Sequence, residues 1–111
     1  ILPPDIEKIE PREVVALFSK CMEFVLKRND HKRHWNNNSM RELHARLRDE
    51  CDELLWELLR HDFHKSEGCG NHIVGPDLCC IANEAIDIAN FAMMIWDKAQ
   101  KMLEEELKKN E

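Results

Sequence analysis

The stretch from Leu78 to Trp96 places the strongest constraint on the fold, because fifteen of its nineteen residues are apolar. The four exceptions recur at helical spacing and form one polar stripe; they are Asn83, Glu84, Asp87 and Asn90. A membrane-spanning helix is disfavoured, because each of two acids near its centre would cost several kcal/mol in lipid and no basic flank precedes the stretch. We therefore expect a helix that is buried on several sides, in a bundle that a second copy of the chain completes.

Composition and periodicity predict an all-α protein with a single domain. The chain has 111 residues, of which 43% are hydrophobic, with three glycines and four prolines, as suits one helix-rich domain. The predicted segments are, in order, an extended arm (1–10), a helix (11–29), a loop (30–38), a helix (39–64), a loop (65–76) and a helix (76–109) that ends in a charged tail (104–111). A break near 96–98 would divide the last helix in two.

These segments predict an antiparallel helical bundle of three to four main helices that is completed by oligomerisation. A small domain buries a low fraction of its surface, so a homodimer or tetramer is expected. The apolar residues expected to face the second subunit are Leu55, Leu59, Ala89, Met93 and Trp96.

Net charge and cysteine content indicate which partners and which cellular compartment to expect. A formal charge of −6 disfavours a nucleic-acid binder, which would present a basic face. The chain has an odd number of cysteines, five in all, and shows no signal-peptide pattern. We therefore expect a cytoplasmic protein with reduced thiols, bound neither to membrane nor to nucleic acid.

Acidic residues lie on the apolar face of the second predicted helix, whose start is marked by the capping-box pair Ser39 and Glu42. Leu43, Leu47, Leu54 and Leu58 form that face. Glu50 falls in its middle, and Glu53 and Glu57 fall on its edge. Glu50 and Glu53 are spaced i, i+3, as are Glu84 and Asp87, so each pair lies side by side on its helix.

Carboxylates inside an apolar interface are unfavourable unless a cation compensates them, and Arg46 is the one obvious basic neighbour. Hard oxygen ligands suit Mg²⁺, with Mn²⁺ as an acceptable substitute. The two acidic pairs on antiparallel helices therefore predict a metal site made of Glu50, Glu53, Glu84 and Asp87.

Three segments together resemble the MazG-like, all-α nucleoside triphosphate pyrophosphohydrolases. Glu50-x-x-Glu53 followed by Glu84-x-x-Asp87 is similar to the ExxE…ExxD signature of that family. The run from Glu84 to Asp97 is similar to the second half of the signature, and His31-Lys32-x-x-Trp35 to a short element that precedes it. Thirty residues separate Glu53 from Glu84, slightly more than is usual, and the extra length falls in the glycine-bearing loop.

The resemblance implies a bundle that forms dimers or tetramers, and the conversion of a (d)NTP and water into the monophosphate and pyrophosphate. By residue match it implies that Glu50, Glu53, Glu84 and Asp87 are Mg²⁺ ligands. Either Glu50 or, in preference, Glu53 would hold or deprotonate the attacking water. Nucleotide-pool house-cleaning is the expected role.

Substrate contacts are expected from a basic cluster ahead of the acidic helix. The cluster comprises Lys27, Arg28, His31, Lys32 and Arg33. It either binds phosphates or only complements the C-terminus of the first helix; the resemblance favours phosphate for Lys32.

Two further residues have open roles. Trp35 either stacks on a base or anchors the loop. Asn90 either contacts the nucleotide or bonds a neighbouring helix.

Three other readings compete with the pyrophosphohydrolase. A zinc-stabilised binding module would use the soft ligands around the second loop, namely Cys69, His72, Cys79, Cys80, His61 and His64, but paired CxxC spacing is missing. A di-iron bundle expects Glu-x-x-His pairs, which neither acidic pair provides. A purely structural helical dimer predicts that removal of Glu84 is harmless or stabilising.

Overall fold

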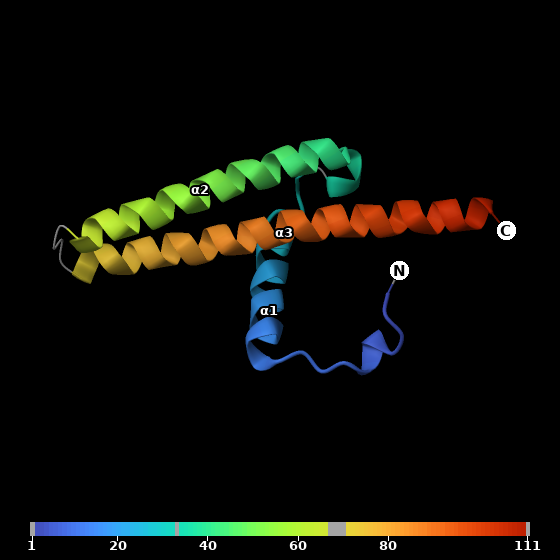
Figure 1. Cartoon of the computed structure of the whole chain (residues 1–111), viewed down its shortest axis with the longest axis horizontal. Coiled ribbons are helices and arrows are strands. Elements are labelled where there is room, and N and C mark those ends of the chain that lie inside the picture. The colour runs from blue at the N-terminus through green and yellow to red at the C-terminus, as the bar shows by residue number, and fades with distance from the viewer. Residues whose placement is uncertain (1, 33, 67–70, 111) are drawn as a thin grey trace.

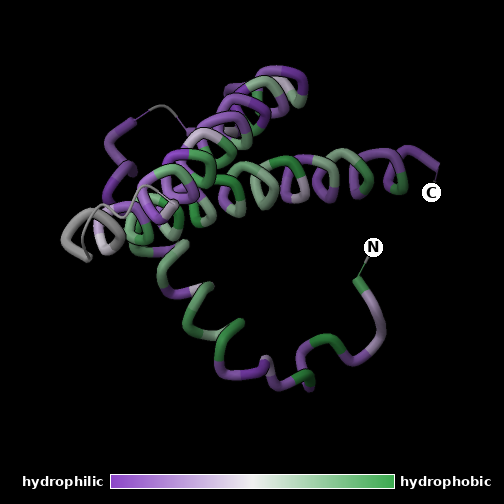
Figure 2. The backbone as a smooth tube through the Cα atoms, turned by 60° about the vertical axis from the view of Figure 1, so that its left-hand side comes forward, coloured by the Kyte–Doolittle hydropathy of each residue, from purple (hydrophilic) through white to green (hydrophobic). Residues whose placement is uncertain are grey.

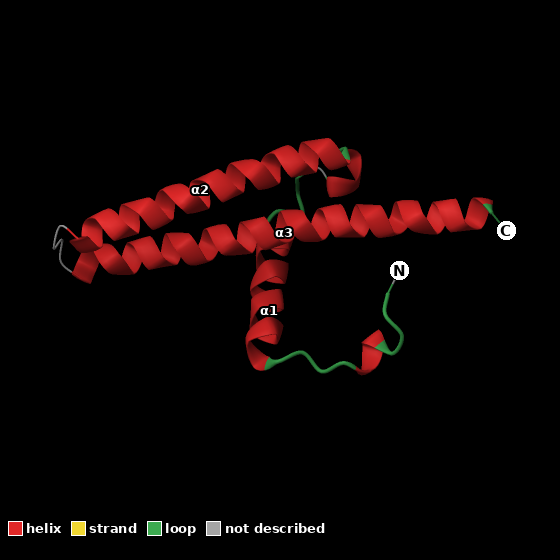
Figure 3. Ribbon diagram, in the orientation of Figure 1, coloured by secondary structure: helices red, strands yellow, loops and turns green. Residues whose placement is uncertain are grey.

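Helices make up the fold of this computed structural model, and no strand occurs in the part of the chain that it describes (Figure 3). That part comprises residues 2–32, 34–66 and 71–110, of which 71–74 are described by their backbone alone. The elements are a 3-10 turn η1 (Ile6–Lys8), helix α1 (Glu13–Arg28), a 3-10 turn η2 (Trp35–Asn37), helix α2 (Met40–Ser66) and helix α3 (Asn71–Lys109). The prediction of an all-α protein is confirmed.

The arrangement is a long antiparallel hairpin of α2 and α3, with α1 crossing α3 near its middle (Figure 1). The chain measures 64 × 32 × 25 Å and has a radius of gyration of 17.9 Å. A compact domain of this length has a radius of gyration of about 13 Å. A single copy of the chain is therefore extended rather than compact.

Helix α2 begins at the predicted capping box. The Ser39 hydroxyl oxygen accepts from the Glu42 backbone N–H at 3.0 Å, and the Ser39 N–H donates to Glu42 Oε1 at 3.3 Å. Leu43 is fully buried against the rest of the fold, and Leu47 and Leu54 are half-buried. Leu58, the fourth leucine of the predicted stripe, is 41% exposed, so the leucines of this face are less buried toward the C-terminal end of α2.

The boundary of α3 differs from the loop expected at 65–76. Helix α2 continues to Ser66, and α3 already begins at Asn71, with Pro76 inside it. Proline usually excludes the helical conformation at the preceding residue, because its ring meets that residue's Cβ. Here the preceding residue is Gly75, which has no Cβ and has open space around it. Helix α3 therefore tolerates Pro76 at the cost of one backbone hydrogen bond.

The rest of α3 is one uninterrupted helix, so the break considered near 96–98 is absent. Its last residues, 104–109, are exposed, as expected of the charged tail. The N-terminal arm is exposed as well and contains the turn η1, which follows Asp5 in a left-handed conformation with φ of 60°.

Apolar side chains are mostly on the surface of this single copy. Leu43 is the only buried hydrophobic residue among those described. Figure 2 shows hydrophobic segments along α1 and α3, whereas α2 is largely hydrophilic. By length and composition alone, the span Gly75–Lys109 of α3 would also suit a membrane crossing, a criterion that does not weigh where its acids Glu84 and Asp87 lie.

Leu43→Ala is expected to destabilise the protein more than any other leucine truncation in α2, by about 2–5 kcal/mol, because Leu43 is the fully buried leucine of that helix and its truncation leaves a cavity. Denaturant unfolding measures the loss. Leu107→Ala, at a side chain that is 53% exposed, is the matched control and should change the free energy of unfolding by less than about 0.5 kcal/mol. Equal losses in the two variants would contradict this assignment of the core.

Candidate metal centre

Three carboxylates from two helices converge between α2 and α3. Glu50 of α2 and Glu84 and Asp87 of α3 each place one oxygen within 4.8 Å of the other two. Each side chain is partly shielded from water by the hairpin. The antiparallel pairing of the helices thus brings together three of the four metal ligands expected from the sequence.

These three acids have no ion-pair partner in the described part of the chain. None of the ion pairs there includes Glu50, Glu84 or Asp87. The Oε2 atoms of Glu50 and Glu84 are buried without a hydrogen-bond partner. Arg46, the expected basic neighbour, lies over the ring of Phe91 at 5.5 Å. Orphaned buried carboxylate oxygens are what a bound divalent cation would satisfy, so the residues present fit a hard metal ion.

Burial of the carboxylates, and secondarily the crowding of like charges, determines the electrostatics of the cluster. Burial, followed by the close approach of the Glu84 carboxyl and the charges of Glu53 and Asp87, raises the pKa of Glu50 to about 8. Burial also raises the pKa of Glu84, against the opposing effect of a hydrogen bond with Glu50, and the charges of Glu53 and Asp87 add to the rise. The pKa of Asp87 rises through burial and the charge of Glu53, against the opposing effect of Arg28. Without a cation, Glu50 therefore keeps its proton up to a pH at which a glutamate is normally ionised.

Glu53 lies at the rim of the cluster. Its side chain is exposed, and it does not belong to the group of oxygens within 4.8 Å. Its charge nevertheless raises the pKa of Glu50, Glu84 and Asp87, so it is close to all three. This position suits a group that holds water beside a metal ion as well as it suits a ligand.

A cavity of about 430 Å³ between α1 and α3 reaches this cluster through Asp87. Its lining combines cations with apolar and amide groups: Lys20, Cys21, Phe24, Val25, Arg28, Asn83, Ile86 and Asp87. Arg28 belongs to the basic cluster and Asn83 to the polar stripe noted in the sequence, whereas Lys20 was not singled out. Lys20 and Arg28 lie two helical turns apart, so they share one side of α1. This spacing could have indicated a basic side of α1, but it does not predict a cavity beside Asp87 until α1 is known to cross α3.

The other basic residues expected at the substrate lie in or near the turn after α1. His31 and Lys32 are exposed, and the Lys32 backbone N–H donates to the Asn29 carbonyl at 2.9 Å. Arg33 lies outside the described residues. None of the three belongs to the cavity lining beside Asp87.

Trp35 joins the segment after α1 to α3. Its indole N–H donates to Asp97 Oδ2 at 2.9 Å, and its ring stacks on His34 with centroids 4.1 Å apart. Lys101 also bonds Asp97, at 2.9 Å, and these donors lower the pKa of that carboxyl. Asp97 follows Asp87 by ten residues, about 15 Å along a helix. In one copy of the chain, Trp35 thus has the contacts of a loop anchor and lies away from the acidic cluster.

Asn90 links α3 to α1. Its side-chain nitrogen donates to the Met22 carbonyl at 3.3 Å, and the residue is 4% exposed. Of the two roles considered, this contact matches the bond to a neighbouring helix. Its Oδ1 is buried without a partner.

The cysteine and histidine ligands required by the zinc-stabilised module do not come together as one group in the described part of the chain. Cys79 and Cys80 are exposed free thiols, as is Cys51, and Cys21 is a half-buried free thiol. Cys69 and the side chain of His72 lie outside the described residues. His61 and His64 instead approach Asp77, which the sequence analysis did not identify.

Metal-free protein is expected to lose stability as the pH rises. The pKa of Glu50 is about 8 in the folded chain against an ordinary value of 4.5, so the folded state binds the proton more tightly. Its contribution is fully present below the ordinary value and is lost as the pH rises through about 8. Thermal melting in a chelator between about pH 5 and about pH 9 should show a falling midpoint, which Glu50→Gln flattens.

Asp52→Asn is the control for this measurement, because Asp52 is exposed on the same helix and its loss should leave the slope unchanged. Added Mg²⁺ should raise the melting midpoint most at high pH, where it does not compete with the proton. An unchanged slope in Glu50→Gln would show that the shifted carboxyl has been wrongly assigned.

Comparison with known proteins does not assign this chain to a family. No protein-family model matches the chain, and no curated protein or solved structure matches it either. The likeness to MazG-like pyrophosphohydrolases therefore rests on the three short segments of the sequence that carry it. The chemistry of the acidic cluster is the remaining guide to function.

Proposed function

We propose that this protein is an Mg²⁺-dependent nucleoside triphosphate pyrophosphohydrolase. It would convert a (d)NTP and water into the (d)NMP and pyrophosphate, in a cytoplasmic nucleotide-pool role. The observation that carries the proposal is the group of carboxylates of Glu50, Glu84 and Asp87, drawn from two helices, with no ion pair among the described residues. The signature spacing of the two acidic pairs agrees with it.

The donor set favours magnesium over softer metals. Three carboxylates offer only hard oxygen ligands, and no imidazole or thiolate belongs to the group. Mg²⁺ takes one or more carboxylates and leaves positions for water and substrate phosphates. Glu50, Glu84 and Asp87 would hold the ion, with Glu53 at the rim. When bound, the ion supplies polarisation of a phosphoryl oxygen and a more acidic water.

The chain's own residues would supply the remaining requirements of hydrolysis. Glu53, exposed and beside the cluster, would orient the attacking water and accept its proton. Lys20 and Arg28, in the cavity that reaches Asp87, would balance the charge of the triphosphate. Attack at the α-phosphorus expels pyrophosphate, whose charge these cations would stabilise.

A second copy of the chain is part of this proposal, because one copy leaves too much surface exposed. The accessible surface is 8918 Å², whereas a compact monomer of 13.2 kDa exposes about 6,400 Å². The excess of about 2,500 Å² matches one subunit's share of a large obligate interface. Leu55, Leu59 and Trp96, expected at that interface, are each more than half exposed.

Loss of a cluster carboxylate is expected to abolish activity. Glu84→Gln should lower Mg²⁺-dependent pyrophosphate release from a mixture of common (d)NTPs by more than about 100-fold, beyond the loss typical of residues that only support metal ligands. Asp52→Asn makes a similar change at an exposed position on α2 and should leave the rate unaltered. The purely structural dimer would be favoured if the unaltered chain releases no pyrophosphate and Glu84→Gln melts at a higher temperature than the unaltered chain.

Introducing charge at the exposed apolar face is expected to separate the subunits. Leu59→Glu and Trp96→Glu place a carboxylate where burial is proposed, which is strongly unfavourable in an apolar interface. Sedimentation velocity should show a dimer or tetramer for the unaltered chain and a shift to single chains for the variants. Lys108→Glu, in the exposed tail, should not alter the assembly. An unaltered chain that sediments as a monomer would overturn the proposed interface.

A further inference from the structure

Helix α1 packs on α3 mainly through the second half of its length. The half-buried side chains of that second half are Cys21, Met22, Val25 and Leu26. In the first half, Val14 and Leu17 are 67% and 61% exposed, and Figure 1 shows this half projecting away from the hairpin. A helix with so little buried apolar surface is held weakly by packing alone. The crossing of α1 over α3 therefore depends on polar contacts as well.

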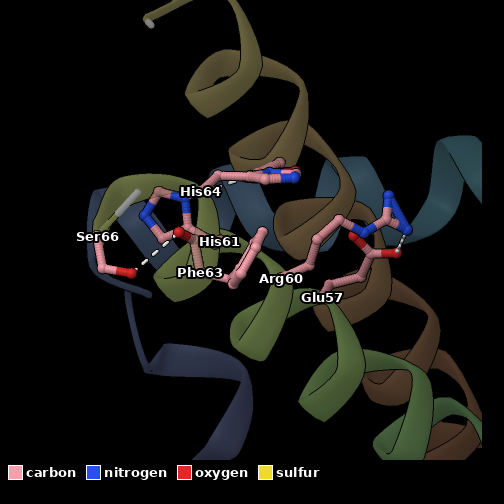
Figure 4. Close-up of polar contacts among 7 residues, drawn as sticks. Glu57, Arg60, His61, Phe63, His64 and Ser66 are labelled. Carbon is pink, nitrogen blue, oxygen red and sulfur yellow. Dashed lines mark hydrogen bonds and ion pairs between the residues drawn. The ribbon is translucent and has the colours of Figure 1, made fainter. Parts of the chain in front are cut away.

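The polar contacts at the closed end of the hairpin, where α2 leads into α3, do not hold α1. There the Nδ1 atom of His64 lies 2.7 Å from Asp77 Oδ2. Arg60 and Glu57 form an ion pair within α2 at 3.3 Å. Figure 4 shows His64, Arg60 and Glu57 along α2. These contacts join α2 to α3 or lie within α2, so the position of α1 is set elsewhere.

Two hydrogen bonds join α1 and the segment after it to α3. At the crossing, the Asn90 side-chain nitrogen donates to the Met22 carbonyl at 3.3 Å. Beyond the C-terminal end of α1, the Trp35 indole N–H donates to Asp97 Oδ2 at 2.9 Å. A helix held at two points along its length keeps a defined direction, which one contact at the crossing would not fix.

The contact at Asp97 is charge-assisted and reinforced by neighbours. Lys101 Nζ donates to the same Asp97 oxygen at 2.9 Å. The hydrogen bonds from Lys101 and Trp35 lower the pKa of the Asp97 carboxyl, and an ionised acceptor strengthens the bond from the indole. Lys98 Nζ donates to the Asn36 carbonyl at 3.2 Å, and Lys101 Nζ to Asn36 Oδ1 at 3.3 Å. The segment that follows α1 is thus fixed to α3 by several bonds.

We propose that Trp35 and Asp97 are positioning residues, which hold α1 over the cavity beside Asp87 and so set the affinity of that cavity for the substrate's triphosphate. This inference rests on the proposed function. The cationic side of the cavity belongs to α1, which supplies Lys20 and Arg28, whereas α3 supplies Asp87. Because the two sides belong to different helices, their separation depends on what fixes α1.

The hydrogen bond at Asp97 acts on the cavity from a distance. Asp97 follows Asp87 by ten residues, about 15 Å along α3, and neither Trp35 nor Asp97 belongs to the cavity lining. Trp35 follows Arg28 by seven residues, which span at most about 25 Å, so a fixed Trp35 limits how far Arg28 moves. Without this contact, fewer molecules would hold Arg28 beside Asp87, and the apparent affinity falls with that fraction.

The experiment measures the binding of inorganic tripolyphosphate with saturating Mg²⁺, because this probe carries the substrate's charge without a base or sugar. Calorimetry gives its Kd at a temperature at which thermal melting shows every variant folded. We expect Trp35→Phe and Asp97→Ala each to raise the Kd about tenfold, the effect of losing one hydrogen bond to a charged group. The double variant should bind no more weakly than Asp97→Ala, because both changes remove the same contact.

Two controls separate positioning from a general loss of structure. Glu105→Gln, at an exposed carboxylate of α3, should leave the Kd for tripolyphosphate unchanged. The affinity for Mg²⁺ alone should be the same in Trp35→Phe and the unaltered chain, because the acidic cluster lies between α2 and α3. In turnover of (d)NTPs, Trp35→Phe should raise KM as much as it raises the Kd and leave kcat unchanged.

Equal Kd values for tripolyphosphate in Trp35→Phe, Asp97→Ala and the unaltered chain would overturn the inference. If Trp35→Phe then raised KM for nucleotides only, the indole would be stacking on a base. An unaltered chain that binds no tripolyphosphate would overturn the inference as well. An unaltered chain that binds tripolyphosphate but releases no pyrophosphate from (d)NTPs would refute the proposed function, and the Kd values would still decide whether Trp35 and Asp97 position the cavity.

Discussion

The burial of carboxylates that face each other across α2 and α3 is the constraint that most shapes the chemistry of this structure. Glu50 and Glu84 sit where the pairing of the hairpin would otherwise bury leucine and isoleucine, and both have an orphaned oxygen. Charged carboxylates in this position destabilise the folded state unless they bind protons or a cation. The raised pKa values and the proposed metal-dependent hydrolysis both follow from these carboxylates being buried between the two helices of the hairpin.

Local geometry explains why much of this was predictable from the sequence. Helical periodicity alone places Glu50 on the face of Leu43 and Leu47, and the capping pair Ser39 and Glu42 fixes where that helix starts. The crossing of α1 over α3 depends on long-range packing, so the cavity that joins Lys20 and Arg28 to Asp87 could not be predicted from spacing. The early start of α3 was missed for a steric reason: glycine before proline removes the clash that usually ends a helix.

Two kinds of donor are kept apart along one hairpin. The acidic cluster offers only oxygen, whereas the group at the closed end offers imidazole nitrogen and a single carboxylate. Glu50 and His61 are eleven residues apart on α2, about 16 Å along the helix. The two groups therefore differ in ligand chemistry as well as in their position along the hairpin.

The central position of α3 has a consequence for how the protein is made. Both α1 and α2 pack mainly on α3, and α3 is the last of these three helices to be synthesised. Neither earlier helix has its main partner until synthesis has passed residue 71, so the apolar side chains of α1 wait uncovered in the nascent chain. The packing of α1 and α2 on α3 thus forms only after most of this chain has been synthesised, and exposed apolar surface of that kind favours aggregation.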